Sequence, residues 1–317
     1  MRRIMRCVPA YMMLDDHEII DNWEPAWQSD KSAARLRRLR RQGVKAFWKY
    51  QRMDDERARS PAGLRDSLSL TFDHGCASFY LLDTRSQRAY RAPGDPNAEA
   101  MFPGAEMASL KKWLEENPNQ VKFVVSPSIV LPRRLGMLNK GASGVAESDG
   151  WEAYPGNLRD LFQFIVTEEI QNVVFLSGDE HLCCVAKATL SMPGKRDVKI
   201  ASIHASGLYA PFPFANARRQ DFTDESDDFP IGCVQCSATA QFVPAGNNFA
   251  VIKVNRQGPT PMVSADFRVA GEWLRVDDVF SGTRLCRSAA SPAPLPDRPP
   301  LCDFSPLAAP VPPSHAT

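Results

Sequence analysis

Short apolar runs along this chain alternate with stretches in which apolar side chains recur at helical spacing. Apolar runs typical of buried strands lie at the end of the segment 1–14 and at 77–82, 121–125, 173–176 and 200–203. Helical spacing predicts helices over 31–53, 104–117 and from Asn157 onward. In the first helix, Phe47, Trp48 and Tyr50 are expected to face the core. Such alternation predicts an α/β fold whose sheet is covered on both faces.

The pattern changes in the last third of the chain. After about Asp227 the helical signals fade, and two apolar runs at 249–254 and 262–269 predict a β-hairpin or small meander. From Ser288 onward the sequence is rich in Pro and Ala, which is typical of a disordered tail. We therefore expect a main domain over 1–226, a C-terminal β segment packed on it over 227–287, and a tail over 288–317.

Charge is balanced overall but not locally. The 317 residues include 38 Lys and Arg against 37 Asp and Glu, so no global field favours a nucleic acid or a membrane surface as a partner. A basic run between Arg35 and Arg41 lies on the first predicted helix. A solvated helix face is the favoured interpretation of this run, and contact with phosphate or RNA is the alternative.

The sequence also bounds the compartment and the role of its eight cysteines. No run approaches the 18 or so apolar residues that a membrane-spanning helix needs, and the basic start lacks a signal-peptide cleavage pattern, so we expect a cytoplasmic protein. Cys183 and Cys184 lie in an apolar stretch and are expected to be buried thiols. Cys233 and Cys236 form a lone CxxC without a second pair, and we assign them no role in chemistry.

Polar clusters follow the apolar strands. They are Asp15-Asp16-His17-Glu18, Asp83-Thr84-Arg85, Ser126-Pro127-Ser128, Asp179-Glu180-His181 and His204-Ala205-Ser206-Gly207. Ligands of open α/β sheets bind outside the carboxyl ends of the strands, so these clusters are expected to converge on one edge.

Two of these clusters have the composition of metal sites. Gly178 allows a sharp turn after its strand, and in extended backbone Asp179 and His181 would point the same way and share one ion. Carboxylate and imidazole donors suit Zn, Fe, Mn or a mixed pair that includes Ca. The cluster at 15–18 brings three carboxylates and an imidazole near the core, which is costly unless cations compensate. An exposed acidic turn with a helix N-cap is the alternative.

Five segments together carry a family likeness: DDHEIIDNW, FWKYQ, LDTRSQR, SDGWEAYP and LSGDEH, which occur in this order at 15–23, 47–51, 82–88, 148–155 and 176–181. This order resembles the PhoD-like phosphatases of the metallophosphoesterase superfamily, over roughly residues 8–215. The resemblance implies a layered α/β/β/α sandwich, a two-metal centre between its sheets, and a phosphate ester as substrate. The expected activity is metal-dependent hydrolysis of phosphate mono- or diesters, of the alkaline phosphatase type.

The resemblance also assigns roles to residues. It implies a metal-ligand set for two divalent or trivalent ions (Fe, Ca, Mn or Zn), comprising Asp16, Asn22, Asp179 and His181. It places His17 beside the leaving group and makes Arg85 a phosphate clamp, with a structural salt bridge to Asp83 as the alternative for Arg85. His204 is expected to be a core histidine or one that supports the site.

One departure from the family affects these expectations. The superfamily takes its first ligands from strands that precede the DDHE-like segment, which here begins at residue 15. We therefore expect an N-terminally truncated sandwich with an unpaired apolar sheet edge, through which the chain could self-associate. The alternative function is that of a catalytically inactive fragment or remnant that acts as a binding or interaction module.

Overall fold

The structure is a computed structural model. It describes residues 8–21, 23, 32–52, 67–89, 101–134, 150–208, 222, 226–243, 246–256, 261–269, 271–280 and 286–287. Asn22 and the predicted tail at 288–317 lie outside the described residues.

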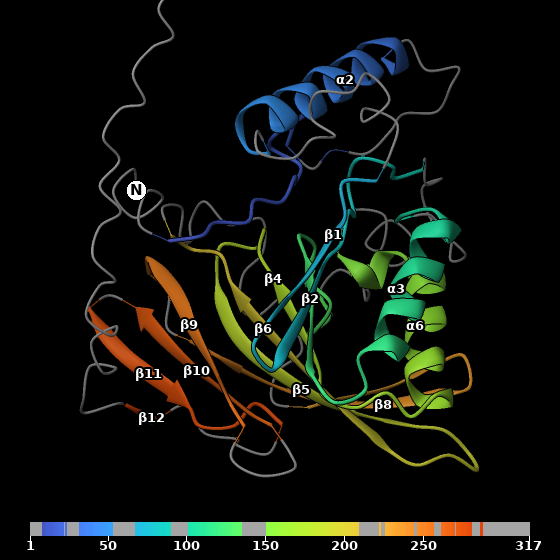
Figure 1. The fold of residues 1–317 in the computed structure, drawn as a ribbon, viewed down its shortest axis with the longest axis vertical. Helices are drawn as coiled ribbons and strands as arrows, with labels where there is room; N and C mark the ends of the chain where they lie inside the picture. The colour runs from blue at the N-terminus through green and yellow to red at the C-terminus, as the bar shows by residue number, and fades with distance from the viewer. Residues whose placement is uncertain are drawn as a thin grey trace, which may run out of the picture.

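The large sheet is mixed and, in the described residues, has eight strands in the order β1-β2-β3-β4-β6-β5-β8-β7 (Figure 1). The strands are β1 (Leu70–His74), β2 (Ala77–Leu81), β3 (Val121–Ser126), β4 (Val173–Ser177), β5 (Cys183–Ser191), β6 (Val198–Ala205), β7 (Asp227–Ile231) and β8 (Val234–Phe242). β2, β3, β4 and β6 run parallel to one another, and the other pairings are antiparallel. The carboxyl ends of these four parallel strands therefore lie at one edge, as the sequence predicts.

The small sheet is antiparallel, with the order β12-β11-β10-β9. Its strands are β9 (Asn248–Asn255), β10 (Met262–Val269), β11 (Glu272–Val276) and β12 (Cys286–Arg287). The predicted hairpin is confirmed, because β9 pairs with β10 over its whole length. Val263 and Phe267 of β10 share one apolar core with Phe123 and Val174 of the large sheet, so the two sheets pack face to face.

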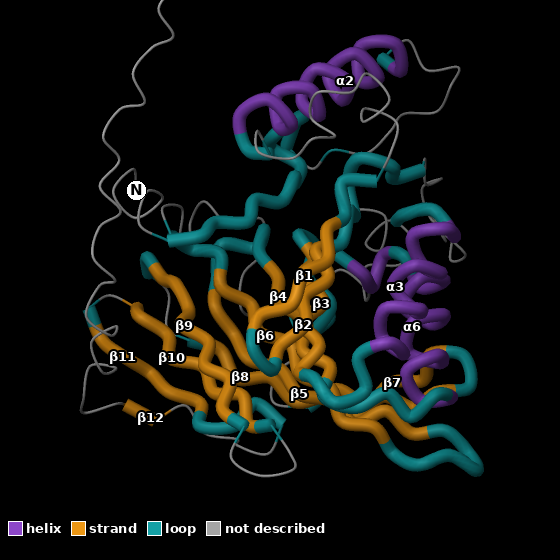
Figure 2. Tube along the Cα trace, in the orientation of Figure 1, coloured by secondary structure: helices purple, strands orange, loops and turns teal. Residues whose placement is uncertain are grey.

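Helices cover the opposite face of the large sheet (Figure 2). They are α3 (Gly104–Glu116), α6 (Pro155–Thr167) and the short 3₁₀ helix η3 (Trp151–Ala153). Leu110 of α3 and Phe162 of α6 pack with Val124 and Phe175 in a second core. The resulting order is helix, sheet, sheet. The fold is mixed α/β, as predicted, and the fourth, helical layer of an α/β/β/α sandwich is not among the described helices.

Two expectations need correction. The apolar run at 9–14 joins neither sheet; instead Leu14 is buried, and Tyr11 stacks on Phe72 of β1 with ring centroids 4.0 Å apart. Only the end of this run is buried, since Pro9, Ala10 and Tyr11 are exposed, and Pro9 has no backbone N–H to donate to a strand partner. The large sheet also continues across the boundary predicted at residue 227, because β7 and β8 belong to it.

Helix α2 (Ala33–Tyr50) confirms the first predicted helix and covers residues 14–20 and Trp23. Its buried Val44, Phe47 and Trp48 form a separate apolar cluster with Leu14 and Ile19. Figure 1 shows α2 beyond one end of the large sheet, next to this segment. The helix therefore fixes the position of the residues that follow Leu14.

Gly43 is the point of closest approach between α2 and this segment. A Cβ at Gly43 would overlap the carbonyl oxygen of Glu18, whereas a Cβ at Gly104, in the first turn of α3, would meet no atom within 4 Å. We expect Gly43→Ala to lower the free energy of unfolding by about 1–3 kcal/mol through overpacking. Gly104→Ala is the matched control and should be neutral or slightly stabilising, since Ala favours helix. Urea unfolding checks both; equal effects of the two substitutions would contradict the close packing.

Candidate functional site

The first element of the site is a tight turn over residues 15–20. The carbonyl oxygen of Asp16 accepts hydrogen bonds from the backbone N–H of Ile19 and Ile20, at 2.7 and 2.8 Å. The Asp16 carboxylate is only 1% exposed and accepts the backbone N–H of His17 at 2.8 Å, while Asp15 is half-buried. The turn thus holds one buried and one half-buried carboxylate side by side.

Glu18 braces this turn against the neighbouring helix. One oxygen of its carboxylate accepts the backbone N–H of Asp15 at 3.0 Å, and the other accepts the side-chain amide of Gln51 at 3.2 Å. Gln51 directly follows α2. Glu18 therefore connects the turn to the helix that packs over it.

The second element is the turn over residues 178–182, between β4 and β5. Asp179 and His181 have φ angles of 82° and 54°, in the left-handed region that non-glycine residues rarely adopt. The prediction of an extended backbone at these two residues is therefore wrong. Each such residue costs on the order of 1–3 kcal/mol and persists only where the surroundings enforce it, as at functional sites. The backbone N–H of His181 donates to Ser206 Oγ at 2.7 Å, which fixes the turn to the end of β6.

The two turns meet. Carboxylate oxygens of Asp15, Asp16 and Asp179 all lie within 4.8 Å of one another. Arg85, which follows β2 and is fully buried, joins them: its Nε donates to Asp15 at 2.7 Å and its Nη2 to Asp179 at 3.2 Å. The predicted convergence of the polar clusters at 15–18, 83–85 and 179–181 is thus observed.

Asp83, the alternative partner predicted for Arg85, binds backbone N–H groups. Asp83 accepts the backbone N–H groups of Arg85 and Ser86, at 3.2 and 2.8 Å, and that of Leu68 at 3.0 Å. Asp83 therefore shapes the turn from which the Arg85 side chain extends toward Asp15 and Asp179.

His17 lies at the outer side of the first turn. Its side chain is 68% exposed, and its Nε2 lies 3.3 Å from the exposed carboxylate of Asp21. Asp16, His17 and Asp21 form a second group whose donor atoms lie within 4.8 Å of one another. His181, which is half-buried, belongs to neither of the two groups that the described residues form.

His204, at the carboxyl end of β6, supports the second turn. It is fully buried, with Nδ1 2.9 Å from Ser177 Oγ and Nε2 3.2 Å from Ser206 Oγ. Burial, together with the nearby Arg134 and His181, lowers the pKa of His204 to about 3. The imidazole is therefore neutral near pH 7 and supports the site through its two serines, in line with the supporting role expected.

This burial predicts a pH dependence. The unfolded chain protonates His204 near its ordinary pKa of 6.5, whereas the folded chain does so only near pH 3, so stability is lost as the pH falls below 6.5. The loss approaches about 1.4 kcal/mol per pH unit. Urea unfolding between pH 7 and 5 should show a shallower pH slope for His204→Gln than for the wild type. His74→Gln, at an exposed histidine of β1, is the control and should keep the wild-type slope.

A buried ion pair holds the middle of the second turn. Glu180 is fully buried and pairs with Arg134, which is itself almost fully buried. Among the described residues, Glu180 Oε2 and Arg134 Nε find no hydrogen-bond partner. Sequence reasoning missed this pair, because nothing in the sequence indicates that Arg134 reaches a residue 46 positions away.

The donor set fits hard cations. Three carboxylates lie together here and Arg85 contributes one positive charge, so further cations would stabilise the ionised carboxylates of the cluster. Carboxylate oxygens suit Ca, Mg and Mn, and an imidazole from His181 would extend the set toward Zn and Fe.

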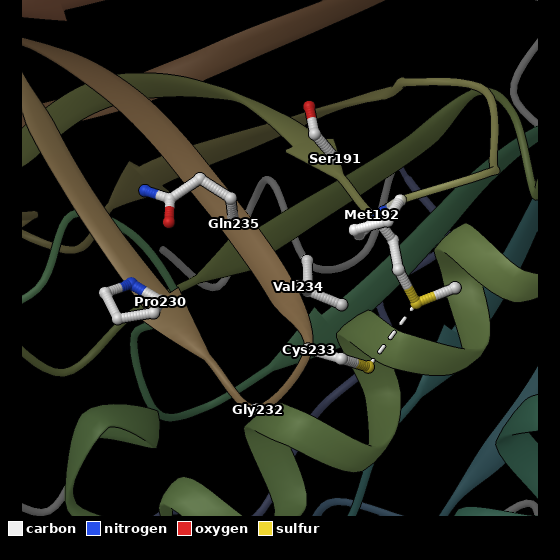
Figure 3. Close-up of a pocket in the computed structure, with 8 residues that line it drawn as sticks. Ser191, Met192, Pro230, Gly232, Cys233, Val234 and Gln235 are labelled. Carbon is white, nitrogen blue, oxygen red and sulfur yellow. Dashed lines mark hydrogen bonds between the residues drawn. The ribbon is translucent and has the colours of Figure 1, made fainter.

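A surface pocket lies at the other end of the large sheet (Figure 3). It is lined by Ser191, Met192, Pro193, Pro230, Gly232, Cys233, Val234 and Gln235. Exposed Cys233 donates to Met192 Sδ at 3.4 Å, while burial raises the pKa of Cys236 to about 12. No carboxylate or imidazole is among the described residues that line this pocket, so it does not share the chemistry of the acidic cluster.

Three comparisons with known proteins found matches. A family model described as "PhoD-like phosphatase" matches residues 1–230. Alkaline phosphatase D of Bacillus subtilis (strain 168) is 27% identical over an alignment of 183 residues, and the match covers 55% of this chain and 31% of that protein. A solved structure titled "Structure of PhoD" aligns with a TM-score of 0.48 and 17% identity, covering 88% of this chain and 54% of that one. The chain thus spans about a third of the curated relative.

Proposed function

The chain belongs to the PhoD-like phosphatase family, and on that premise we propose that it hydrolyses phosphate mono- or diesters at the acidic cluster. The observation that supports this proposal is the meeting of Asp15, Asp16 and Asp179, which come from distant parts of the sequence, around a buried arginine. Carboxylates brought together in this way need cations, and cations beside an arginine can bind a phosphoryl group.

The metal ligands in this proposal are Asp16 and Asp179, with His181 and Asn22 completing the set for two ions. Metal ions bound there would supply a water of lowered pKa and neutralise charge that develops on the attacking and leaving oxygens. The chain contributes the placement of the donors. Arg85 joins the two turns that carry Asp15 and Asp179, so both carboxylates are oriented before any ion binds.

Two further side chains act on the substrate. The Arg85 guanidinium lies against the cluster, where its planar fork can also donate to phosphate oxygens. His17 is exposed beside the buried Asp16, and Asp21 orients its imidazole from 3.3 Å. In this position His17 can protonate the departing alkoxide.

Hydrolysis of chromogenic substrates tests the proposal. The folded chain, treated with chelator and then reloaded with Mn, Fe, Ca or Zn, is assayed on p-nitrophenyl phosphate and bis-p-nitrophenyl phosphate. We expect turnover that returns with metal and falls by about 10²–10⁴-fold in His17→Ala, the typical contribution of a general acid. A metal-loaded, folded protein that shows no turnover above the His17→Ala variant would support the inactive binding module instead.

A further inference from the structure

Helix α2 concentrates positive charge on its exposed face. Its 18 residues include seven Arg and Lys and no acidic residue, although the chain as a whole carries a formal charge of only +1. Six of the seven are exposed: Arg35, Arg37, Arg38, Arg41, Lys45 and Lys49. In the part of the chain that the structure describes, none of these six forms an ion pair with a carboxylate. This face is therefore a cationic surface that the described residues do not neutralise.

The opposite face of α2 holds the helix in place. Val44, Phe47 and Trp48 are buried in the cluster with Leu14 and Ile19, and the half-buried Arg40 donates to the carbonyl oxygen of Ser86. The cationic face is thus presented on a fixed helix. Arg38 lies seven residues before Lys45, and Lys45 lies four before Lys49, so the three share one side of the helix. At 1.5 Å per residue, Arg35 to Lys49 spans about 21 Å, room for several phosphates.

An exposed aromatic ring completes this surface. Tyr50, expected from the sequence to be buried, is 67% exposed at the end of α2, and Lys49 Nζ lies 5.0 Å from its ring centroid. An exposed aromatic ring beside cations is the combination on which the bases of a single strand stack while its phosphates are held.

The apolar side of α2 argues against a membrane surface as the partner of the cationic face. A helix that lies on a bilayer inserts its apolar face among the lipids. In α2 that face, with Val44, Phe47 and Trp48, is already buried against the protein. Phosphate contacts from the outer face remain possible without any rearrangement, so a soluble polyanion fits better.

We propose that the outer face of α2 binds single-stranded nucleic acid, with its Arg and Lys side chains on the phosphates and Tyr50 stacked on a base. The sequence alone favours a solvated helix face. The structure adds the fixed orientation, the six exposed cations and the exposed ring. The proposal does not depend on the phosphoesterase activity, because it needs neither metal ions nor turnover.

Fluorescence anisotropy with a labelled 12-nucleotide single strand tests the proposal, in EDTA so that hydrolysis plays no part. The variant Arg38→Gln/Lys45→Gln/Lys49→Gln should bind at least tenfold more weakly, and the slope of log K against log salt should become shallower by about 2. The matched control, Arg196→Gln/Lys199→Gln/Lys112→Gln, removes one Arg and two Lys from exposed positions elsewhere and should bind as the wild type.

Tyr50→Ala separates stacking from charge. It should weaken binding about fivefold or more without a change in the salt slope. Three results would overturn the proposal: no binding of the oligonucleotide at 20 mM salt, an equal loss in the control triple variant, or binding to phosphatidylserine vesicles by a protein that does not bind the oligonucleotide. The third would assign the surface to anionic lipid.

Discussion

Asp179→Asn should lower kcat for phosphate-ester hydrolysis by about a thousandfold. Metal-assisted charge stabilisation contributes several kcal/mol, and about 4 kcal/mol corresponds to this factor. The amide keeps the size of the carboxylate and loses its charge. Asn also tolerates the left-handed conformation that position 179 requires, so the turn should persist.

The measurement is steady-state turnover of metal-loaded protein whose circular dichroism matches that of the wild type. Asp160→Asn is the matched control, since Asp160 is an exposed residue of α6 whose carboxylate pairs with Lys111. That variant should keep full activity. A folded Asp179→Asn protein that retains more than a tenth of wild-type activity would remove Asp179 from the mechanism.

Breaking the Glu180–Arg134 pair should have the largest effect on stability. Glu180→Leu leaves the Arg134 guanidinium buried without its counter-charge, which costs about 3–5 kcal/mol in known buried pairs. Because Glu180 lies between Asp179 and His181, the turn that carries both should loosen as well. Urea unfolding measures the loss of stability.

A second variant separates the ion pair from simple packing. In Glu180→Leu/Arg134→Met no buried charge is left uncompensated, and such replacements are often neutral or stabilising. The double variant should therefore recover most of the stability that Glu180→Leu loses. If the double variant is as unstable as Glu180→Leu, the cost arises from the shape of the side chains and not from the unpaired guanidinium.

Sequence patterns predicted the helices and strands in which apolar side chains recur at a regular spacing. Helices α2, α3 and α6 and strands β2, β3, β4 and β6 follow from their apolar spacing, because they are packed on the cores. β1 was not predicted, since only half-buried positions alternate with exposed ones along it. β8 alternates buried and exposed residues, yet its inward side chains include the small Cys236, Ala238 and Ala240, which give a weak signal.

The site was predictable in composition but not in geometry. Clusters that follow apolar runs indicated that Asp16 and Asp179 would converge. β4 places Asp179 at the edge of the sheet, whereas Asp16 is held there by the packing of its neighbours Leu14 and Ile19 against α2. The left-handed backbone at Asp179 and His181 could not be predicted from the sequence, because neither residue is the Gly that usually marks this conformation. The partners of Arg85 and Arg134 depend on contacts between distant residues, which no local pattern encodes.

We infer that Asp16 and Asp179 hold the same cation. Isothermal titration of Mn²⁺ into chelator-treated protein tests it with Asp16→Asn, Asp179→Asn and the double variant. We predict that each single change weakens the binding of one and the same ion by at least about tenfold. The double variant should lose less binding free energy than the sum of the two single losses, because both residues bind the same ion. Wild-type Mn²⁺ affinity in either single variant would contradict the claim.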